Sequence, residues 1–323
     1  MLNVKLAKFA IILSSIILGG ALTSTCMAAE SGALNYPAGS PGPLVGEFPP
    51  IQGLFMVSQT SYTTSTALYD SHGDKIDADD FSMDAWAETF RILASYPRQL
   101  WGARLYSQLV IPIVHVDSSL SVSTPFGSID IFDDSDAGLG NITVSPLIMN
   151  WYFPESHQYF TVGLDIALEA GASYSANSPV NAGTGYNTIM PVLAYRYDNP
   201  NGFDIGARLT PMFNLENDNT DYDTGDMVAV DFTTGWNIGK WKVGIVGGYT
   251  KQFENDQKNG VDIPNSKMES LLVGPSIMYS VGPIIINLNY QKGVLAENTS
   301  KNDSFWLNFT IPLYVPESAR PKK

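Results

Sequence analysis

The stretch QYFTVGLDIALEA, residues 158–170, decides the fold. Its apolar side chains occupy every second position, at Phe160, Val162, Leu164, Ile166 and Leu168. The positions between them include Thr161, Asp165 and Glu169. Strict alternation of this kind predicts a β-strand with one face in an apolar environment and the other in a polar one. The stretch exceeds the roughly 5 to 6 residues of an average soluble strand, and it is long enough for the roughly 9 to 11 residues that cross a membrane at a barrel's tilt.

The same alternation recurs to the end of the chain. After residue 50 there is no apolar run long enough for a transmembrane helix and no sustained helical periodicity. We expect twelve strands, at residues 52–69, 81–96, 101–117, 139–153, 157–171, 186–198, 202–216, 226–239, 240–254, 267–281, 282–296 and 303–315. The first two are the least clear, because neither of their faces is uniformly apolar. An even number closes an antiparallel barrel with both termini on one side. The predicted fold class is therefore all-β: a transmembrane antiparallel up-and-down β-barrel over residues 51–315, with periplasmic termini and a short tail at 316–323.

The connections between these strands alternate in length. The short ones contain Pro or Gly, at residues 97–99, 154–156, 199–202, 238–240 and 281–283. The long ones hold much of the Asp and Glu, at residues 70–80, 118–138, 172–185, 217–225, 255–266 and 297–302. Outer-membrane barrels have short periplasmic turns and long outward loops, so we expect that orientation here. Aromatic residues near strand ends predict interfacial girdles: Trp101, Trp151, Tyr152, Phe153, Tyr195, Tyr197, Trp236 and Trp241.

The first residues predict a secretory signal. Lys5 and Lys8 precede an apolar run over residues 9–22, and small residues follow at 25–29, so we expect removal of residues 1–28 by cleavage near Ala28 or Ala29. An uncleaved anchor is disfavoured because the run is shorter than the roughly 20 residues that a spanning helix needs. Lipid attachment at Cys26 is disfavoured because Thr25 precedes it. Residues 29–50 hold five prolines and predict an irregular lead-in that lies in the periplasm or plugs the lumen.

Signal removal also changes the composition. It removes the single cysteine, which leaves no disulfide framework. Loss of two lysines leaves 16 basic against 32 acidic residues, a net charge of −16, which argues against nucleic acid and anionic membrane surfaces as partners. The sequence has no zinc-type cluster, Walker loop or dinucleotide fingerprint, so no cofactor is expected.

Charged and polar side chains fall on the predicted inward faces of several strands. These lumen-lining candidates are Arg104, Gln108, Asp165, Glu169, Arg196, Asp204, Arg208, Asp231 and Lys242. A turn centred on Pro200 would place Arg196 opposite Asp204, within reach for a cross-strand pair. Such charges either form a constriction that selects solutes or simply neutralise one another in a polar interior.

Two other site classes have weaker support. Residues 218–226 are rich in Asp and Asn, but position twelve from Asp218 or Asp221 is Ala229 or Phe232, not the Glu of a calcium loop. A solvated acidic loop that reaches lipopolysaccharide phosphates through divalent ions is the plainer interpretation. The three histidines, His72, His115 and His157, stand apart along the chain, so we expect neither a catalytic nor a metal site.

Several stretches resemble the outer-membrane family named for the meta-pathway of phenol degradation, whose members are described as transporters. They are GLGNITVSP at 138–146, GLDI at 163–166, TDYDTGD at 220–226 with VDF at 230–232, YQK at 290–292, AEN at 296–298, and FWL to IPL at 305–313. Their order and spacing cover most of the mature chain. The resemblance implies a barrel that passes hydrophobic or aromatic compounds. The tail at 316–323 departs from the family pattern, in which chains end with the last strand.

The expected function is an outer-membrane channel or transporter for small hydrophobic, including aromatic, compounds in a Gram-negative bacterium. The alternative is a non-conducting structural or surface-interaction barrel whose acidic loops carry the function. The expected partners are outer-membrane lipid and lipopolysaccharide, a small hydrophobic solute and the outer-membrane assembly machinery, with no nucleic acid.

Overall fold

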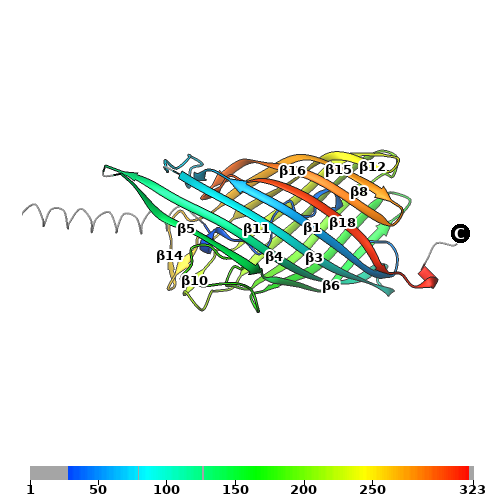
Figure 1. Cartoon of the computed structure of the whole chain (residues 1–323). Helices are drawn as coiled ribbons and strands as arrows, with labels where there is room; N and C mark the ends of the chain where they lie inside the picture. Colours follow the sequence, from blue (N-terminus) through cyan, green and yellow to red (C-terminus); the bar gives the residue numbers. More distant parts are fainter. Residues whose placement is uncertain (1–27, 79, 126, 320–323) are drawn as a thin grey trace, which may run out of the picture.

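Twelve antiparallel strands close into one barrel in the computed structural model, which describes residues 28–78, 80–125 and 127–319 (Figure 1). They are β1 (Gly53–Ser65), β3 (Asp80–Leu100), β4 (Ala103–Thr124), β6 (Ile142–Phe153), β7 (Gln158–Leu168), β8 (Thr188–Asp198), β9 (Phe203–Asn214), β11 (Met227–Ile238), β12 (Trp241–Gln252), β15 (Glu269–Val281), β16 (Ile284–Glu297) and β18 (Asp303–Tyr314). Each strand pairs with the next, and β18 returns to pair with β1. The predicted up-and-down barrel and its strand count are confirmed.

The alternation of the sequence becomes an apolar outside and a polar inside. On β7, Phe160 and Val162 are exposed on the outer surface, whereas Thr161 and Asp165 are buried inside. An outer-membrane barrel places such an apolar outer face against lipid, and its polar side chains pair in the lumen. In the part of the chain that the structure describes, no helix is long and apolar enough to cross a membrane. The predicted signal sequence, residues 1–28, lies outside the described residues except for Ala28.

Two sequence predictions about connections are wrong. Residues 118–138 are not a loop, because β4 continues to Thr124 and pairs with β5 (Gly127–Leu139) in a hairpin that extends past β6. Ser and Asp occupy both faces of this hairpin, so it lacks the apolar face that marks the other strands. The turn after β3 is centred on Trp101 and Gly102 rather than on residues 97–99. The pairing of β3 with β4 instead shifts in register between Ser95 and Gln99.

Three short pairings organise the outward loops. β10 (Tyr222–Asp223), β13 (Gln257–Lys258) and β14 (Val261–Asp262) form a small sheet, and β2 (Leu68–Tyr69) pairs with β17 (Thr299–Ser300). In Figure 1, β10 and β14 lie at the same end of the barrel as the tip of the β4–β5 hairpin. Because long connections face outward in these barrels, we take this end as the extracellular mouth.

Residues 28–52 run through the inside of the barrel from one end to the other, and only η1 (Glu30–Gly32) and η2 (Gly42–Leu44) are regular (Figure 1). At the extracellular mouth the Ala28 amide donates to the Asn298 carbonyl, 2.9 Å away. At the opposite end the Tyr106 hydroxyl donates to the Pro49 carbonyl, 2.8 Å away. We call residues 28–52 the luminal segment. The chain leaves it at the periplasmic end, where β1 begins beside the end of β18. The prediction of periplasmic termini therefore fits the tail after β18, but it is wrong for the first described residues, which lie at the extracellular mouth.

The tail after β18 holds one short 3-10 turn, η3 (Glu317–Ala319). It lies at the periplasmic end of the barrel, on the side where the chain also enters β1 (Figure 1).

Candidate functional site: the barrel interior

One side of the lumen is lined by charged groups, and we call it the charged wall. It consists of the inner faces of β7, β8, β9, β11 and β12. Six predicted lumen residues lie on it, all nearly or fully buried: Asp165, Arg196, Asp204, Arg208, Asp231 and Lys242. Alternation along the strands places these residues inside the barrel. Their charges pair with one another, which offsets the free-energy cost of burying a charge.

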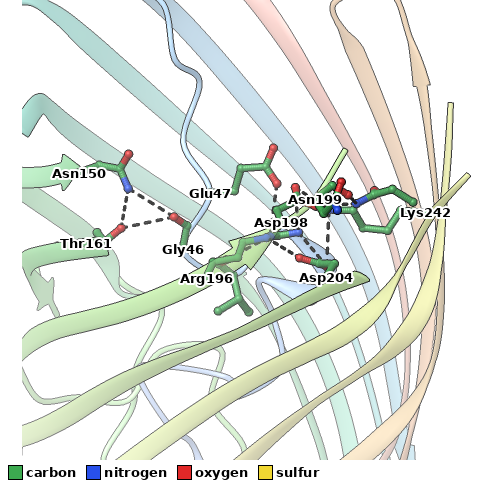
Figure 2. A network of polar contacts seen from close by, with 11 residues as sticks. Gly46, Glu47, Asn150, Thr161, Arg196, Asp198, Asn199, Asp204 and Lys242 are labelled. Atoms are coloured by element: carbon green, nitrogen blue, oxygen red, sulfur yellow. Dashed lines mark hydrogen bonds and ion pairs between the residues drawn. The ribbon is translucent and has the colours of Figure 1, made fainter. Parts of the chain in front are cut away.

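The charges nearest the periplasmic turns form one network around Arg196 (Figure 2). Arg196 donates twice to Asp204, at 2.9 Å from Nε and 3.1 Å from Nη2. It also pairs with Glu47 of the luminal segment at 3.3 Å. Lys242 reaches Asp198 at 3.0 Å and Asp204 at 3.5 Å. Two cations thus meet three carboxylates, and the arginine joins the wall to the luminal segment.

The predicted register of this pair is wrong, although the pair itself forms. Asp204 lies opposite Asp198, and Arg196 lies opposite Gly206. The turn is therefore centred one residue later than Pro200. Arg196 has the length to reach Asp204 diagonally across the strands, where a bidentate guanidinium–carboxylate contact is strong.

A second network lies at mid-height. Arg208 donates to Asp165 at 2.7 Å, and its guanidinium stacks over the Tyr36 ring with 4.9 Å to the centroid. The Tyr36 hydroxyl donates to Asp231 at 2.5 Å, and the Gly39 amide donates to the same carboxylate at 2.6 Å. Asp231 is fully buried, and its hydrogen bonds with Tyr36 and Gly39 fasten the luminal segment to the wall at two points.

The remaining predicted residues have different positions. Gln108 is buried on β4 and accepts from Arg91 at 3.1 Å. Arg104 is half-buried, and it pairs in register with Asn150 near the periplasmic turns. Glu169 follows the end of β7 and is exposed, so the structure does not bring it together with the buried networks.

Sequence reasoning missed four members of these networks, namely Tyr36, Glu47, Arg91 and Asp198. The first two belong to the luminal segment, which has no periodicity to reveal a contact. Arg91 lies on a strand with mixed faces, and Asp198 ends its strand beside the turn. Of the four, only Asp198 could have been predicted from the sequence, because it lies two residues after Arg196 and so on the same face of the strand.

Carbonyl groups of the luminal segment are also bound along its length. Arg196 donates to Val45, Asn150 and Thr161 both donate to Gly46, and Gln291 donates to Gly39. Gly39 has φ +91°, and a Cβ there would lie 2.1 Å from the Gln291 side-chain oxygen. Only glycine therefore fits at this closest approach.

Two cavities remain beside the luminal segment. The lower one, of about 360 Å³, lies toward the periplasm and borders Leu44, Phe48 and Ile51. The upper one, of about 380 Å³, borders Ala33, Leu34 and Ala38. Between them, Gln59 of β1 donates to the Ser40 carbonyl at 2.9 Å. This hydrogen bond ties the middle of the luminal segment to the wall opposite the Asp231 anchor.

The upper cavity is bounded by a second, chemically different surface, which we call the apolar wall. It is the inner face of β3 and β4 over residues 81–89 and 112–118. Apolar side chains line most of it: Phe81, Met83, Ala85, Ala87, Pro112, Val114 and Val116. An apolar inner face is unusual in these barrels, whose interiors are polar as a rule.

The outer face of the same strands mixes polar and apolar side chains, among them Glu88, Trp86 and Ile113. Glu88 lies between the inward residues Ala87 and Thr89 and therefore points outward. Its carboxylate accepts from Ser58 and Thr60 at 2.5 Å each. One step closer to the mouth, Tyr62 and Trp86 pair in register and are exposed as a girdle would be. This explains why neither face of the first two strands looked uniformly apolar.

The histidines do not build a catalytic arrangement where the structure describes them. His115 pairs with Asp117 at 2.9 Å on the outer face, with both side chains about half exposed. Ser71 and Asp70 approach His72 through the same ring nitrogen, at 3.3 Å and 4.0 Å, so the ring cannot relay a proton between them. Among the described residues no group of three or more His, Cys, Asp or Glu side chains could hold a metal ion.

Comparison with known proteins places this geometry in context. The sequence profile described as "Putative MetA-pathway of phenol degradation" matches residues 65–309. The COG4313 outer membrane channel from Pseudomonas putida F1 is similar in structure, with a TM-score of 0.70 at 16% identity, over 84% of this chain and 98% of that chain. No curated protein matches the sequence at a significant level.

Two autotransporter barrels are more distantly similar. The transport unit of AIDA-I from Escherichia coli has a TM-score of 0.48 at 7% identity, over 87% of this chain and 100% of that chain. The β domain of Bordetella BrkA has a TM-score of 0.46 at 10% identity, over 81% and 100%. At such scores the likeness says nothing further about this chain.

Proposed function

This chain belongs to the MetA-pathway family, and we propose that it is an outer-membrane channel for uptake of small hydrophobic compounds, aromatic ones included. The single observation that carries the proposal is the apolar wall beside the upper cavity. A barrel that only spanned the membrane would need no apolar surface inside, whereas an apolar solute needs one to leave water.

The size of the cavities fits this class of solute. Small-molecule sites commonly enclose about 300 to 1,000 Å³, and an apolar cavity of about 150 Å³ accepts benzene. The two cavities, of about 360 and 380 Å³, therefore accept a single aromatic ring each. The lower cavity combines apolar side chains such as Phe55 and Leu93 with the Arg91 and Arg208 cations, so it suits a ring that carries a polar group.

The route we propose follows the apolar wall. The luminal segment is fastened to the charged wall by Arg196 and Asp231, and to β1 by the Gln59–Ser40 hydrogen bond. Opening that bond connects the two cavities without breaking an ion pair. Solutes would pass from the upper to the lower cavity there, with the charged wall as the fixed support.

The acidic outer loops and the assembly pathway complete the proposal. Asp130 and Asp133 are exposed on the β4–β5 hairpin, where divalent ions could link them to lipopolysaccharide phosphates. Insertion into the membrane would require the outer-membrane assembly machinery, as for other single-chain barrels.

A cavity-filling variant tests the route. Ala87→Trp places an indole in the upper cavity, and Ala94→Trp on the same strand places it on the outer face, since its neighbours Leu93 and Ser95 are buried. Uptake of labelled phenol, toluene and a long-chain fatty acid is measured in proteoliposomes. We expect the wild-type barrel to accelerate the aromatics, Ala87→Trp to abolish most of that acceleration and Ala94→Trp to preserve it.

Two outcomes would contradict the proposal. Equal uptake by the Ala87→Trp and Ala94→Trp barrels would remove the upper cavity from the route. Failure of the wild-type barrel to accelerate any of the three solutes would favour the non-conducting surface barrel instead.

A further inference from the structure

Asp256 is a buried carboxylate at the extracellular mouth, in the connection between β12 and β15. Its side chain is fully buried. It accepts hydrogen bonds from the amides of Ala29 at 3.1 Å and Gly225 at 2.8 Å. The Gln252 amide and the Tyr222 hydroxyl donate to it at 2.6 Å and 2.7 Å. All four donors are neutral.

The described Lys, Arg and His side chains form no ion pair with Asp256. Burial accordingly raises the pKa of the Asp256 carboxyl. A buried carboxylate normally has a cationic partner, because its desolvation is otherwise uncompensated. Among residues 28–78, 80–125 and 127–319, no side chain provides one.

The Ala29 backbone has a conformation that suits a chain terminus better than a chain interior. Its φ of 61° and ψ of 148° lie in a region that is essentially restricted to glycine. The restriction arises from contacts of the Cβ with the preceding peptide group. When Ala29 is the first residue there is no preceding group, and the strain disappears.

We propose that the Asp256 pocket binds the α-ammonium group of Ala29, which removal of the signal sequence creates. The sequence predicts cleavage near Ala28 or Ala29, and the proposal rests on hydrolysis of the bond between them. Water cleaves that bond to a carboxylate on Ala28 and an ammonium on Ala29. The neutral amide donor at 3.1 Å from Asp256 is thereby replaced by a cation with three donors.

The second residue of the processed chain, Glu30, is also held by the surrounding loops. The Glu30 amide donates to the Thr224 hydroxyl at 3.3 Å. The Glu30 carboxylate accepts from Asn217 at 2.6 Å and from Tyr174 at 3.3 Å. Loops from three hairpins therefore close around the first two residues of the processed chain. Removal of the signal sequence supplies the cation, so the outer end of the luminal segment becomes locked after processing.

Labelling of the α-amine tests this site and involves no solute, so it is independent of the transport proposal. The mature barrel is purified from outer membranes, and its intact mass identifies the first residue. It is then treated with an acetylating reagent at neutral pH, folded and denatured, and the N-terminal peptide is quantified by mass spectrometry. We expect the chain to begin at Ala29, and its amine to react about tenfold or more slowly in the folded barrel, because ion pairing and burial keep it protonated and covered.

Two variants separate charge from burial. Asp256→Asn keeps the shape of the pocket but removes the charge, so labelling of the folded barrel should accelerate severalfold. Asp262→Asn, an exposed carboxylate of the same loop, should leave the rate unchanged. A mature chain that begins elsewhere, equal folded and denatured rates for the wild type, or an Asp256→Asn rate equal to that of the wild type would each overturn the proposal. If Asp256→Asn does not fold, the wild-type mass and rates still decide.

Discussion

The charged wall and the apolar wall face each other across one lumen and follow opposite rules. On the charged wall the outer face is apolar and the inner face holds paired ions, as on β8 and β9. On the apolar wall the inner face of β3 and β4 is apolar and the outer face carries Glu88. The difference indicates that the two walls have different roles. The charged wall fastens the luminal segment, and the apolar wall borders a cavity where water finds few hydrogen-bond partners.

The largest expected effect is loss of Arg196 from the charged wall. Arg196→Met leaves the buried Asp204 and the partly buried Asp198 and Glu47 with only Lys242 to offset their charge. Removing one partner of a buried ion pair costs about 3 to 5 kcal/mol. Urea unfolding of the barrel in lipid vesicles measures the loss.

The matched control is Lys251→Met, which breaks the exposed pair with Glu269. Exposed pairs contribute about 1 kcal/mol or less, so this variant should unfold almost like the wild type. Equal losses of stability for the two variants would mean that the ion pairs of the charged wall stabilise the barrel no more than an exposed pair does.

An intermediate effect is expected where the luminal segment touches β12. A Cβ on Gly248 would lie 2.3 Å from the backbone of Ala38 and Gly39, so Gly248→Ala must displace the segment. Displacement breaks the Gly39 bonds to Asp231 and Gln291, at about 1 kcal/mol each. Hydrogen exchange of residues 36–41 should accelerate by roughly tenfold or more.

Gly163→Ala provides the control, because its Cβ would come no closer than 3.3 Å to another residue, at the Ile148 side chain. Exchange in the luminal segment should then stay at the wild-type rate. If Gly248→Ala also leaves exchange unchanged, the segment does not lie against β12 in the membrane.

The smallest effect is expected on the outer face of the apolar wall. Glu88→Leu removes a carboxylate from the lipid-facing side, just below the Tyr62–Trp86 girdle. A charge near the interface costs at most about 1 kcal/mol, so we expect a gain in barrel stability of that size or less. Urea unfolding of the variant in vesicles measures it. A clear loss of stability would indicate that Glu88 supports the barrel through Ser58 and Thr60.

Sequence patterns predicted the charged wall better than the apolar wall for a physical reason. Alternation identifies inward residues only when the two faces differ in polarity, as on residues 158–170. On β3 the pattern is blurred, because Ala85 and Ala87 face an apolar cavity and Glu88 faces outward. The strand was found, but its faces could not be assigned.

Other features had no local signal. The luminal segment makes its contacts through carbonyl groups and isolated side chains such as Tyr36, so no periodicity predicts its path. The register of β9 depends on a turn centred one residue after Pro200, and turn-forming residues in the sequence do not fix a turn centre to one residue. The Arg196–Asp204 contact survived that error because a long arginine reaches two positions.

The central claim is that residues 28–52 occupy the lumen and are held against the charged wall. A Cβ on Gly46 would lie 3.4 Å from the Ala194 Cβ, close to the roughly 3.5 to 4.5 Å of a disulfide. The direct measurement is thiol labelling of a Gly46→Cys, Ala194→Cys barrel in intact outer membranes, with and without reductant. An Ala38→Cys, Ala194→Cys barrel serves as the control. The account predicts thiols that become reactive only after reduction in the first barrel and free thiols in the control; free thiols in both barrels would contradict it.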